Sequence, residues 1–330
     1  MLTTCLASAI LLTQAPAPQV SRLQTFDQFK AIALVGAPTG SNFAAALENG
    51  DVRIFDANKR ATVFNLKGHP QPVYGIAFSP NGQEIVTGDE TARIFVWNLK
   101  TGQKVREFPR KTEYHGRGIQ GLAFSPDGQT LLSTGKDDVV IAWNYKTMLP
   151  KFRLGGNGVI FSNATYSGKS IAVATQTEGL HFRNSGNLGL TQKNVAHANL
   201  GVNELVVSRD GTRVYTAGRD GAVGIWASGN MSLVGYLKGG HSDWVQKIAI
   251  SPNGQMVASS SNDRNVVLWS VKTMKKVGLI GDQSAVGSPI TFTGDGKFLI
   301  TTNINDSLQI NSISPSQGVP TKAPVKRRRR

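Results

Sequence analysis

Histidines, hydroxyl residues and aspartates recur along the sequence at a spacing that could build a hydrolase triad. After each of four histidines, a serine or threonine follows by 18 or 19 residues and a tryptophan by 28 or 29. In three sets an aspartate stands six residues before the tryptophan, whereas the first set has Thr91 at that point. A hydroxyl activated by a histidine that a carboxylate orients is the nucleophile of acyl-transfer enzymes. The sets are His69, Thr87 and Trp97; His115, Ser133, Asp137 and Trp143; His197, Thr216, Asp220 and Trp226; and His241, Ser259, Asp263 and Trp269.

The repetition of these sets favours a structural role over catalysis. A hydrolase needs one working site, whereas each copy here would need its own oxyanion donors and substrate cleft. A buried indole N–H needs a hydrogen-bond partner, and the hydroxyl and the histidine can continue that chain of partners. We therefore predict hydrogen-bonded braces inside repeated structural units, and no catalytic residue.

The sequence predicts neither a metal site nor a cofactor. It has a single cysteine, Cys5, and its histidines and acids form no cluster with metal-ligand spacing. His181 alternates with Leu180 and Phe182 as in a strand, so we interpret it as an outward-facing strand residue and not as a ligand. A phosphate-binding GxxxxGK[ST] motif is also missing from the sequence.

The stretches that hold the histidines are copies of one another. HPQPVYGIAFSPNG ends at Gly82, HGRGIQGLAFSPDG at Gly128 and HSDWVQKIAISPNG at Gly254. Seven turn sequences, spaced by 41 to 46 residues, begin at Ala37, Ser79, Ser125, Tyr166, Ser208, Ser251 and Thr293. Tight turns between alternating runs predict antiparallel strands. In the second unit these strands are Val73–Ser79, Glu84–Thr87, Arg93–Asn98 and Lys104–Phe108.

A repeat of about 40 to 45 residues with four strands is typical of a propeller blade. We predict an all-β fold: a single seven-bladed β-propeller over residues 18–313, with four antiparallel strands per blade. The blades are expected at residues 31–67, 73–110, 119–154, 158–200, 201–239, 244–280 and 287–313. Pro315 and Pro320 follow the last expected strand, Leu308–Ile313, and proline cannot donate to a sheet ladder. Residues 20–26 should therefore supply the missing outer strand of the last blade and close the ring.

At this point the sequence resembles the WD40-repeat family of β-propellers, over about residues 20–313. The motifs that carry the resemblance are the Gly-His pairs at His69 and His241, the SPDG-like turns, and strand ends reading VWN, AWN, IWA and LWS. The Trp-Asp pair itself is not kept, and we place Phe55, Phe182 and Ile310 at the tryptophan position of the other three units. The resemblance implies a rigid, non-enzymatic scaffold that binds protein or peptide partners.

Loops on one face of such a ring are the expected contacts of a partner. These loops lead into the first strands or join the second and third strands of a blade. Aromatic and arginine side chains are the usual anchors of an interface. The candidates are Gln71, Tyr114, Arg117, Lys136, Arg219, Trp244 and Arg264.

Charge and the two chain ends leave two alternatives open. The formal charge is +15, and +9 remains without the six cations Lys322, Lys326, Arg327, Arg328, Arg329 and Arg330. Residues 314–330 are predicted to be a disordered basic tail, of which Lys326 to Arg330 suit an anionic surface. The charge therefore leaves open a polyanion or nucleic-acid binder as one alternative function. The other alternative is a propeller lactonase or hydrolase with its site in the central channel.

Residues 1–17 resemble a signal peptide, because an apolar run from Leu6 to Leu12 precedes small residues and prolines. The run is shorter than the ~20 residues of a spanning helix, so we expect no membrane segment in the mature chain. We expect a periplasmic or secreted protein, and a cytoplasmic one if these residues are not a signal.

Overall fold

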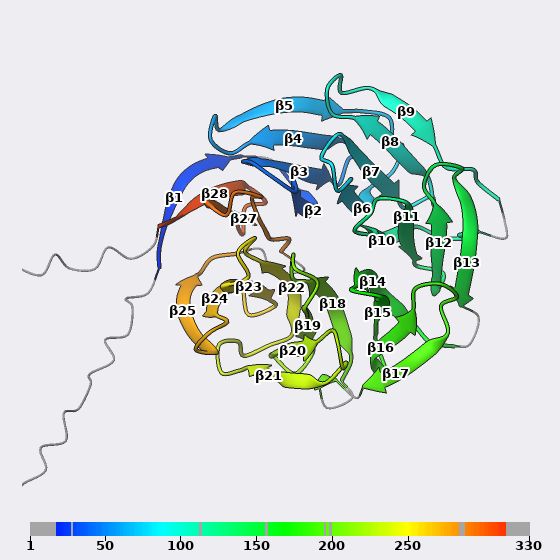
Figure 1. Cartoon of the computed structure of the whole chain (residues 1–330). Helices are drawn as coiled ribbons and strands as arrows, with labels where there is room; N and C mark the ends of the chain where they lie inside the picture. Colours follow the sequence, from blue (N-terminus) through cyan, green and yellow to red (C-terminus); the bar gives the residue numbers. More distant parts are fainter. Residues whose placement is uncertain are drawn as a thin grey trace, which may run out of the picture.

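The computed structural model describes residues 18–27, 29–111, 114–155, 158–194, 196–197, 200–283 and 288–314. The described chain forms seven four-stranded antiparallel sheets arranged as blades around a central axis (Figure 1). The prediction of a seven-bladed β-propeller is confirmed. Residues 1–17 and 315–330, to which we assigned the signal peptide and nearly all of the basic tail, lie outside the described residues. None of the helices in the described ranges is long and apolar enough to cross a membrane.

Each blade runs from an innermost to an outermost strand. Blade 1 has β2 (Ala31–Gly36), β3 (Asn42–Leu47), β4 (Val52–Asp56) and β5 (Ala61–Leu66); blade 2 has β6 (Val73–Phe78), β7 (Glu84–Asp89), β8 (Ile94–Asn98) and β9 (Lys104–Glu107). Blade 3 has β10 (Ile119–Phe124), β11 (Thr130–Gly135), β12 (Val139–Asn144) and β13 (Leu149–Gly155); blade 4 has β14 (Phe161–Ser167), β15 (Ser170–Thr175), β16 (Gly179–Asn184) and β17 (Leu190–Asn194). Blade 5 has β18 (Val202–Val207), β19 (Arg213–Gly218), β20 (Val223–Ala227) and β21 (Leu233–Leu237); blade 6 has β22 (Val245–Ile250), β23 (Met256–Ser261), β24 (Val266–Ser270) and β25 (Lys275–Ile280). Blade 7 has β26 (Thr291–Phe292), β27 (Phe298–Thr302), β28 (Leu308–Ser314) and β1 (Gln19–Phe26).

The repeated turns join the first two strands of a blade through local hydrogen bonds. In blade 2 the Ser79 hydroxyl donates to Asn81 Oδ1 at 2.7 Å and accepts from the Glu84 N–H at 2.9 Å. Gly82 takes a positive φ of 69°, a conformation that glycine adopts without steric cost. The SPNG sequence therefore fixes the reversal between β6 and β7.

The hydrophobic core lies between neighbouring blades. One cluster joins Ala44 and Ile54 of blade 1 to Ile85 and Trp97 of blade 2, and all four side chains are buried. Burial of apolar surface is the main favourable contribution to folding, and a single four-stranded sheet cannot cover both of its own faces. Each blade thus depends on its neighbours for stability.

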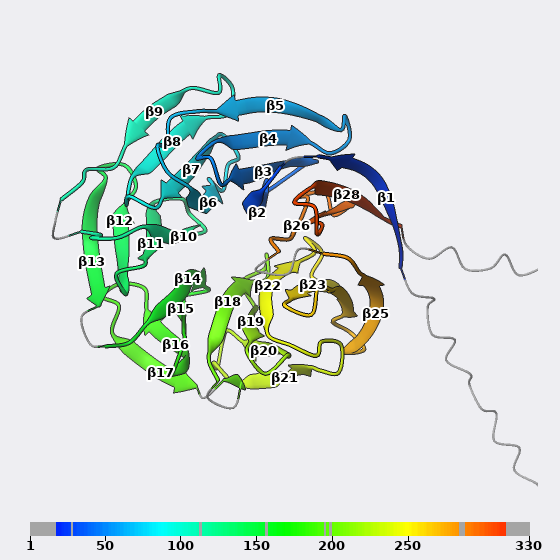
Figure 2. The ribbon, with the colours of Figure 1, turned by 180° about the vertical axis from the view of Figure 1, so that it is seen from behind.

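The ring closes within blade 7, where β1 pairs antiparallel with β28 from Phe26 and Leu308 to Gln19 and Ser314. Figure 2 shows β1 along the outer side of β28 from behind. Leu23 and Phe26 pack against the core between blades 7 and 1. The prediction that an early segment completes the last blade is confirmed.

The innermost strands of blades 1 to 6 share one irregularity, a bulge at their second residue. In blade 3, for example, the register runs from Ile119 opposite Gly135 to Gly121 opposite Thr134, so one residue is unpaired. A bulge of this kind turns a side chain out of the regular alternation. The extra residues are Ile32, Tyr74, Gln120, Ser162, Asn203 and Gln246.

A second set of bulges corrects two of our residue assignments. In blades 2, 3, 5 and 6 the register between the third and fourth strands shifts just before the tryptophan. The same shift precedes Phe55 in blade 1, Arg183 in blade 4 and Asn311 in blade 7. Phe182 and Ile310 are therefore the wrong residues for the tryptophan position, because each precedes it by one residue and points to the other face of its sheet.

Candidate functional site

The recurring polar residues form hydrogen-bonded chains inside four blades. In blade 3 the Trp143 indole donates to Ser133 Oγ at 2.7 Å, and Ser133 Oγ lies 2.7 Å from His115 Nε2. His115 Nδ1 lies 3.1 Å from Asp137 Oδ1. A carboxylate can only accept, so the ring donates from Nδ1 to the aspartate. The chain links the third strand, the second strand and the loop before the first strand.

Blades 5 and 6 repeat this arrangement. In blade 5, His197 lies 2.8 Å from Asp220 and from Thr216, and Trp226 donates to Thr216 at 2.9 Å. In blade 6 the corresponding distances are 3.0 Å from His241 to Asp263, 2.8 Å from His241 to Ser259, and 2.8 Å from Trp269 to Ser259. One brace thus recurs in separate blades, each time between the same elements.

Blade 2 has the same brace, but Asp89 supplies its carboxylate in place of the expected Thr91. His69 Nδ1 lies 2.8 Å from Asp89 Oδ2, and His69 Nε2 lies 2.7 Å from Thr87, which accepts from Trp97 at 2.8 Å. Asp89 occupies the strand position that Gly135 has in blade 3, where a Cβ would collide with the histidine. A side chain at this position therefore points straight at the ring, and Thr91 only donates to Asp89 Oδ1 at 2.8 Å.

Burial and hydrogen bonding together shift the pKa of the brace aspartates and of His241. Burial alone would raise the pKa of Asp137, yet the hydrogen bond from His115 and the backbone N–H of Gly116 bring that pKa below its ordinary value. Burial lowers the pKa of His241 against the opposing attraction of Asp263. At neutral pH His241 is therefore a neutral ring beside an ionised carboxylate.

These chains do not have the accessibility of a catalytic triad. The four histidine side chains are 0 to 2% exposed. Each hydroxyl is already held between a histidine and an indole N–H, as at Ser259. A substrate carbonyl cannot reach the oxygen without displacing the tryptophan, so the braces act as internal supports.

His181 lies at 2% side-chain exposure on β16, which corrects its assignment as an outward-facing residue. Its Nε2 is 3.1 Å from Glu178, which also pairs with Lys193 at 3.1 Å. In the ranges that the structure describes, no group of three or more histidine, cysteine or acidic residues could hold a metal ion.

A second candidate site is a cavity of about 480 Å³ at one end of the central axis. Antiparallel pairing places the loops before the first strands and the loops between second and third strands at the same end of every sheet. We call this end of the ring the mouth face and the opposite end the turn face. Lys136, Gln176, Arg219 and Trp244 line the cavity from loops of the mouth face.

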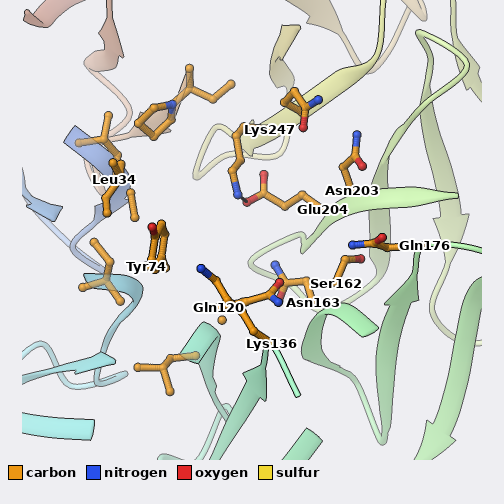
Figure 3. A pocket seen from close by; sticks show the side chains of 18 of the residues that line it. Leu34, Tyr74, Gln120, Lys136, Ser162, Asn163, Gln176, Asn203, Glu204 and Lys247 are labelled. Carbon is orange, nitrogen blue, oxygen red and sulfur yellow. Dashed lines mark hydrogen bonds and ion pairs between the residues drawn. The ribbon is translucent and has the colours of Figure 1, made fainter. Parts of the chain in front are cut away.

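All six bulge residues line this cavity, which divides into two walls. Ile32, Leu34, Ile76 and Ile290 form an apolar wall from blades 1, 2 and 7. Blades 3 to 6 supply a polar wall. Figure 3 shows Leu34 and Tyr74 on one side, opposite Asn203 and Gln176 on the other. The polar lining residues of blades 3 to 6 are Gln120, Lys136, Ser162, Asn163, Gln176, Asn203, Glu204, Arg219, Gln246 and Lys247.

Three cations line the cavity, and two of them are neutralised. Lys247 pairs with Glu204 at 3.1 Å, and Lys136 pairs with Glu90 while lying 4.2 Å from the centre of the Tyr74 ring. Arg219 instead lies 4.9 Å from the Trp244 ring centre and donates from Nε to Asn203 Oδ1 at 2.9 Å. Among the lining residues that the structure describes, Arg219 is the cation without a carboxylate in ion-pair range.

The seven residues we assigned to a partner-binding face fall into three groups. Lys136, Arg219 and Trp244 line the cavity. Gln71, Arg117 and Arg264 are exposed on the mouth face outside the cavity. Tyr114 is half-buried and packs edge-on against Trp143 at 5.0 Å, so its ring supports blade 3.

Sequence reasoning missed the six bulge residues. Each follows the first residue of an innermost strand, and four of them stand five or six residues after a brace histidine: Tyr74, Gln120, Asn203 and Gln246. That spacing is visible in the repeats. The bulge that leaves these residues unpaired and turns their side chains toward the channel is not visible in the sequence.

A ring of seven four-stranded sheets with histidine–hydroxyl–tryptophan braces defines a repeat propeller of the WD class. Four segments match the family described as WD domain, G-beta repeat: residues 60–98, 106–144, 190–227 and 232–270. Each segment contains all or part of the outer strand of one blade and the three inner strands of the next. Four stretches of the chain thus match WD40 repeats.

Curated relatives share short stretches with this chain. Pre-mRNA-processing factor 19 of Schizosaccharomyces pombe is 32% identical over 77 residues, which is 23% of this chain and 16% of that protein. The U3 small nucleolar RNA-associated protein 15 homolog of Xenopus tropicalis is 27% identical over 94 residues, or 28% of this chain and 18% of the relative. Transcriptional corepressor LEUNIG_HOMOLOG of Arabidopsis thaliana is 40% identical over 72 residues, which is 21% of this chain and 9% of that protein. The matched stretch spans less than a fifth of each of these relatives.

Proposed function

We propose that this chain is a non-enzymatic scaffold that binds a protein partner on its mouth face. The observation that carries the proposal is the contrast between two sets of polar residues. The histidine, hydroxyl and aspartate side chains are used inside the blades, whereas Trp244 is 44% exposed at the cavity beside a cation. An exposed tryptophan next to an arginine is the composition of an interface anchor.

The rigidity of the ring supports this function. The braces connect the second and third strands of a blade to the loop that leads into its first strand, so they hold the mouth face from within. In blade 6, Asp263 accepts from the backbone N–H of Ser242 at 3.0 Å, two residues before Trp244. Loops held in one conformation lose little entropy on binding, and this favours affinity.

The names of two relatives refer to pre-mRNA processing and to U3 small nucleolar RNA. If the protein is cytoplasmic, those names make a ribonucleoprotein component one candidate class of partner for this chain. The formal charge of +15 supports a second candidate function, binding to a polyanion. A steep loss of affinity for a nucleic acid with added salt, independent of its sequence, would favour this second function.

Affinity capture with surface variants tests the scaffold proposal. The full chain, Trp244→Ala, Arg117→Ala and the turn-face control Lys272→Ala would each be crosslinked to partners in extracts of the native host. Trp244→Ala and Arg117→Ala should lose a protein that the unchanged chain and Lys272→Ala both retain. Equal recovery of that protein by all four chains would reject the mouth face as the binding surface.

We also propose that the protein is extracytoplasmic, on the basis of the signal-like residues 1–17. N-terminal sequencing of the protein from fractionated native cells tests this proposal. Cleavage near Ala15 or Ala17 with recovery outside the cytoplasm is expected, and an intact Met1 in the cytoplasmic fraction would reject it.

A further inference from the structure

We infer that Arg219, Trp244 and Asn203 form a receptor for the carboxylate of one acidic side chain, which the bound partner inserts into the cavity. This inference rests on the proposed scaffold function, because it names the chemistry that the mouth face recognises. The three residues come from different elements: the loop between β19 and β20, the loop before β22, and the bulge of β18.

The guanidinium of Arg219 is held in place before any ligand arrives. Its Cζ lies over the Trp244 ring, 4.9 Å from the ring centre, and its Nε–H donates to Asn203 Oδ1 at 2.9 Å. Asn203 is itself fixed, since its Nδ2 donates to the Val245 carbonyl at 2.9 Å. Stacking and one hydrogen bond from Nε leave the terminal Nη groups free to donate, and these match the two oxygens of a carboxylate.

The charges around the cavity indicate a ligand group with a single negative charge. Lys247 is paired with Glu204, whose second oxygen accepts from the Ile248 N–H at 2.8 Å. Lys136 is paired with Glu90. Arg219 therefore contributes one uncompensated positive charge to the lining. A carboxylate balances one charge, whereas a dianionic phosphate is commonly bound by a cluster of arginines.

A comparison of the two cation–aromatic pairs shows why one is a receptor and the other a support. Lys136 over Tyr74 and Arg219 over Trp244 each join neighbouring blades at the mouth face. Glu90 occupies the ion-pair position of Lys136 from within the chain. Among the residues that the structure describes, no carboxylate lies within ion-pair distance of Arg219, so a partner can supply it. The neighbouring amide side chains of Gln176 and Gln246 offer further donors in the same cavity.

Trp244 provides a direct readout of this site. The other four tryptophans are at most 3% exposed and donate their indole N–H groups to braces. In the full chain labelled with ¹⁵N at the indole nitrogens, Trp244→Phe identifies the signal of Trp244. The probes are the pentapeptide acetyl-Gly-Gly-Glu-Gly-Gly-amide, its Gln counterpart and its phosphoserine counterpart.

The Glu peptide should shift the Trp244 signal saturably and leave the four brace signals in place. The Gln peptide should bind at least about tenfold more weakly, because it lacks the charge that strengthens the hydrogen bonds. Arg219→Lys keeps the positive charge but removes the planar guanidinium that can bind both carboxylate oxygens. This variant should bind the Glu peptide about fivefold more weakly or worse. Lys272→Gln, on the turn face, should bind the Glu peptide as the unchanged chain does.

Equal binding of the Glu and Gln peptides, unchanged binding by Arg219→Lys, or a phosphoserine peptide that binds more than about tenfold tighter than the Glu peptide would each overturn the carboxylate receptor. The four brace signals report whether each variant is folded. Failure of the peptides to bind, with partner capture still sensitive to Trp244→Ala, would reject the receptor and leave the scaffold function standing. Selective Glu binding with no partner captured at the mouth face would reject the scaffold function alone.

Discussion

Blades 2, 3, 5 and 6 have the polar brace with its tryptophan on the third strand. In blades 1, 4 and 7 another residue takes the tryptophan position and is held by other contacts. In blade 1, Phe55 replaces the tryptophan, stacks on Phe43 at 5.0 Å, and contacts Phe26 and Phe29. In blade 4, Arg183 takes the position and donates to the Leu188 carbonyl at 2.9 Å. In blade 7, Asn311 donates to the Leu299 carbonyl at 3.2 Å. Packing of the blade therefore requires a side chain that fills the tryptophan position, and aromatic, charged and amide side chains can all do so.

Replacing Phe55 with alanine should have the largest effect on stability. The side chain is fully buried and touches aromatic rings of blades 1 and 7, so its loss opens a cavity at the seam of the ring. We expect the free energy of unfolding to fall by about 3 to 5 kcal/mol, measured by denaturant titration. A loss below about 1 kcal/mol would mean that the seam repacks, and that aromatic filling is not what stabilises blade 1.

A smaller effect should separate Asp89 from Thr91 in the brace of blade 2. Asp89→Ala leaves the buried His69 Nδ1 without its acceptor and should cost about 1 to 3 kcal/mol. Thr91→Ala removes only a bond to the already satisfied carboxylate and should cost about 1 kcal/mol or less. Denaturant titration of both variants is the test. The reverse order would restore Thr91 as the residue that completes this brace.

Stability should also fall as the pH is lowered from 7 to 4. Burial holds the pKa of His181 and of His241 below the ordinary 6.5, so the unfolded chain takes up these protons first. The brace aspartates, whose burial is outweighed by hydrogen bonds such as that from His69 to Asp89, have pKa values below 3.8 and add a further loss near pH 4. Unfolding midpoints measured at each pH should decline, and more gently above pH 5 in His181→Gln. A flat profile would contradict the assigned protonation states.

The smallest effect on stability is expected at the mouth face. Trp244→Ala removes a side chain that is 44% exposed, so the free energy of unfolding should change by no more than about 0.5 kcal/mol. The same variant should lose the captured partner. A thermal shift assay run beside the capture separates the two results, because a large loss of stability would make Trp244 a structural residue like the buried tryptophans.

The repeat made the fold predictable from sequence, because turn spacing, strand alternation and the unpaired early segment all indicate a closed seven-bladed ring. The brace residues were predictable for the same reason, since they recur with the turns. Asp89 was not, because the carboxylate moved to a glycine position while the usual position became Thr91. Phe182 and Ile310 were misplaced by one residue, since in degenerate blades no tryptophan marks the bulge.

The cavity was harder to foresee than the braces. Trp244, Lys136 and Arg219 stand out as loop residues of the right type, and they do line it. Their pairing does not appear in the sequence: Lys136 finds Glu90 and Arg219 finds Trp244 only when neighbouring blades meet. Contacts between repeats depend on ring geometry, whereas contacts within a repeat follow the spacing that each unit preserves.

The pairing of β1 with β28 sets the order in which this protein can finish folding. The ribosome makes residues 19–26 before any blade exists, but their partner strand, Leu308–Ser314, is made almost 300 residues later. Until then β1 has an open edge, to which a strand of another chain can add. Synthesis of β28 is therefore the step that ends this exposure. A chain released before β28 is made has an open ring and is prone to aggregate.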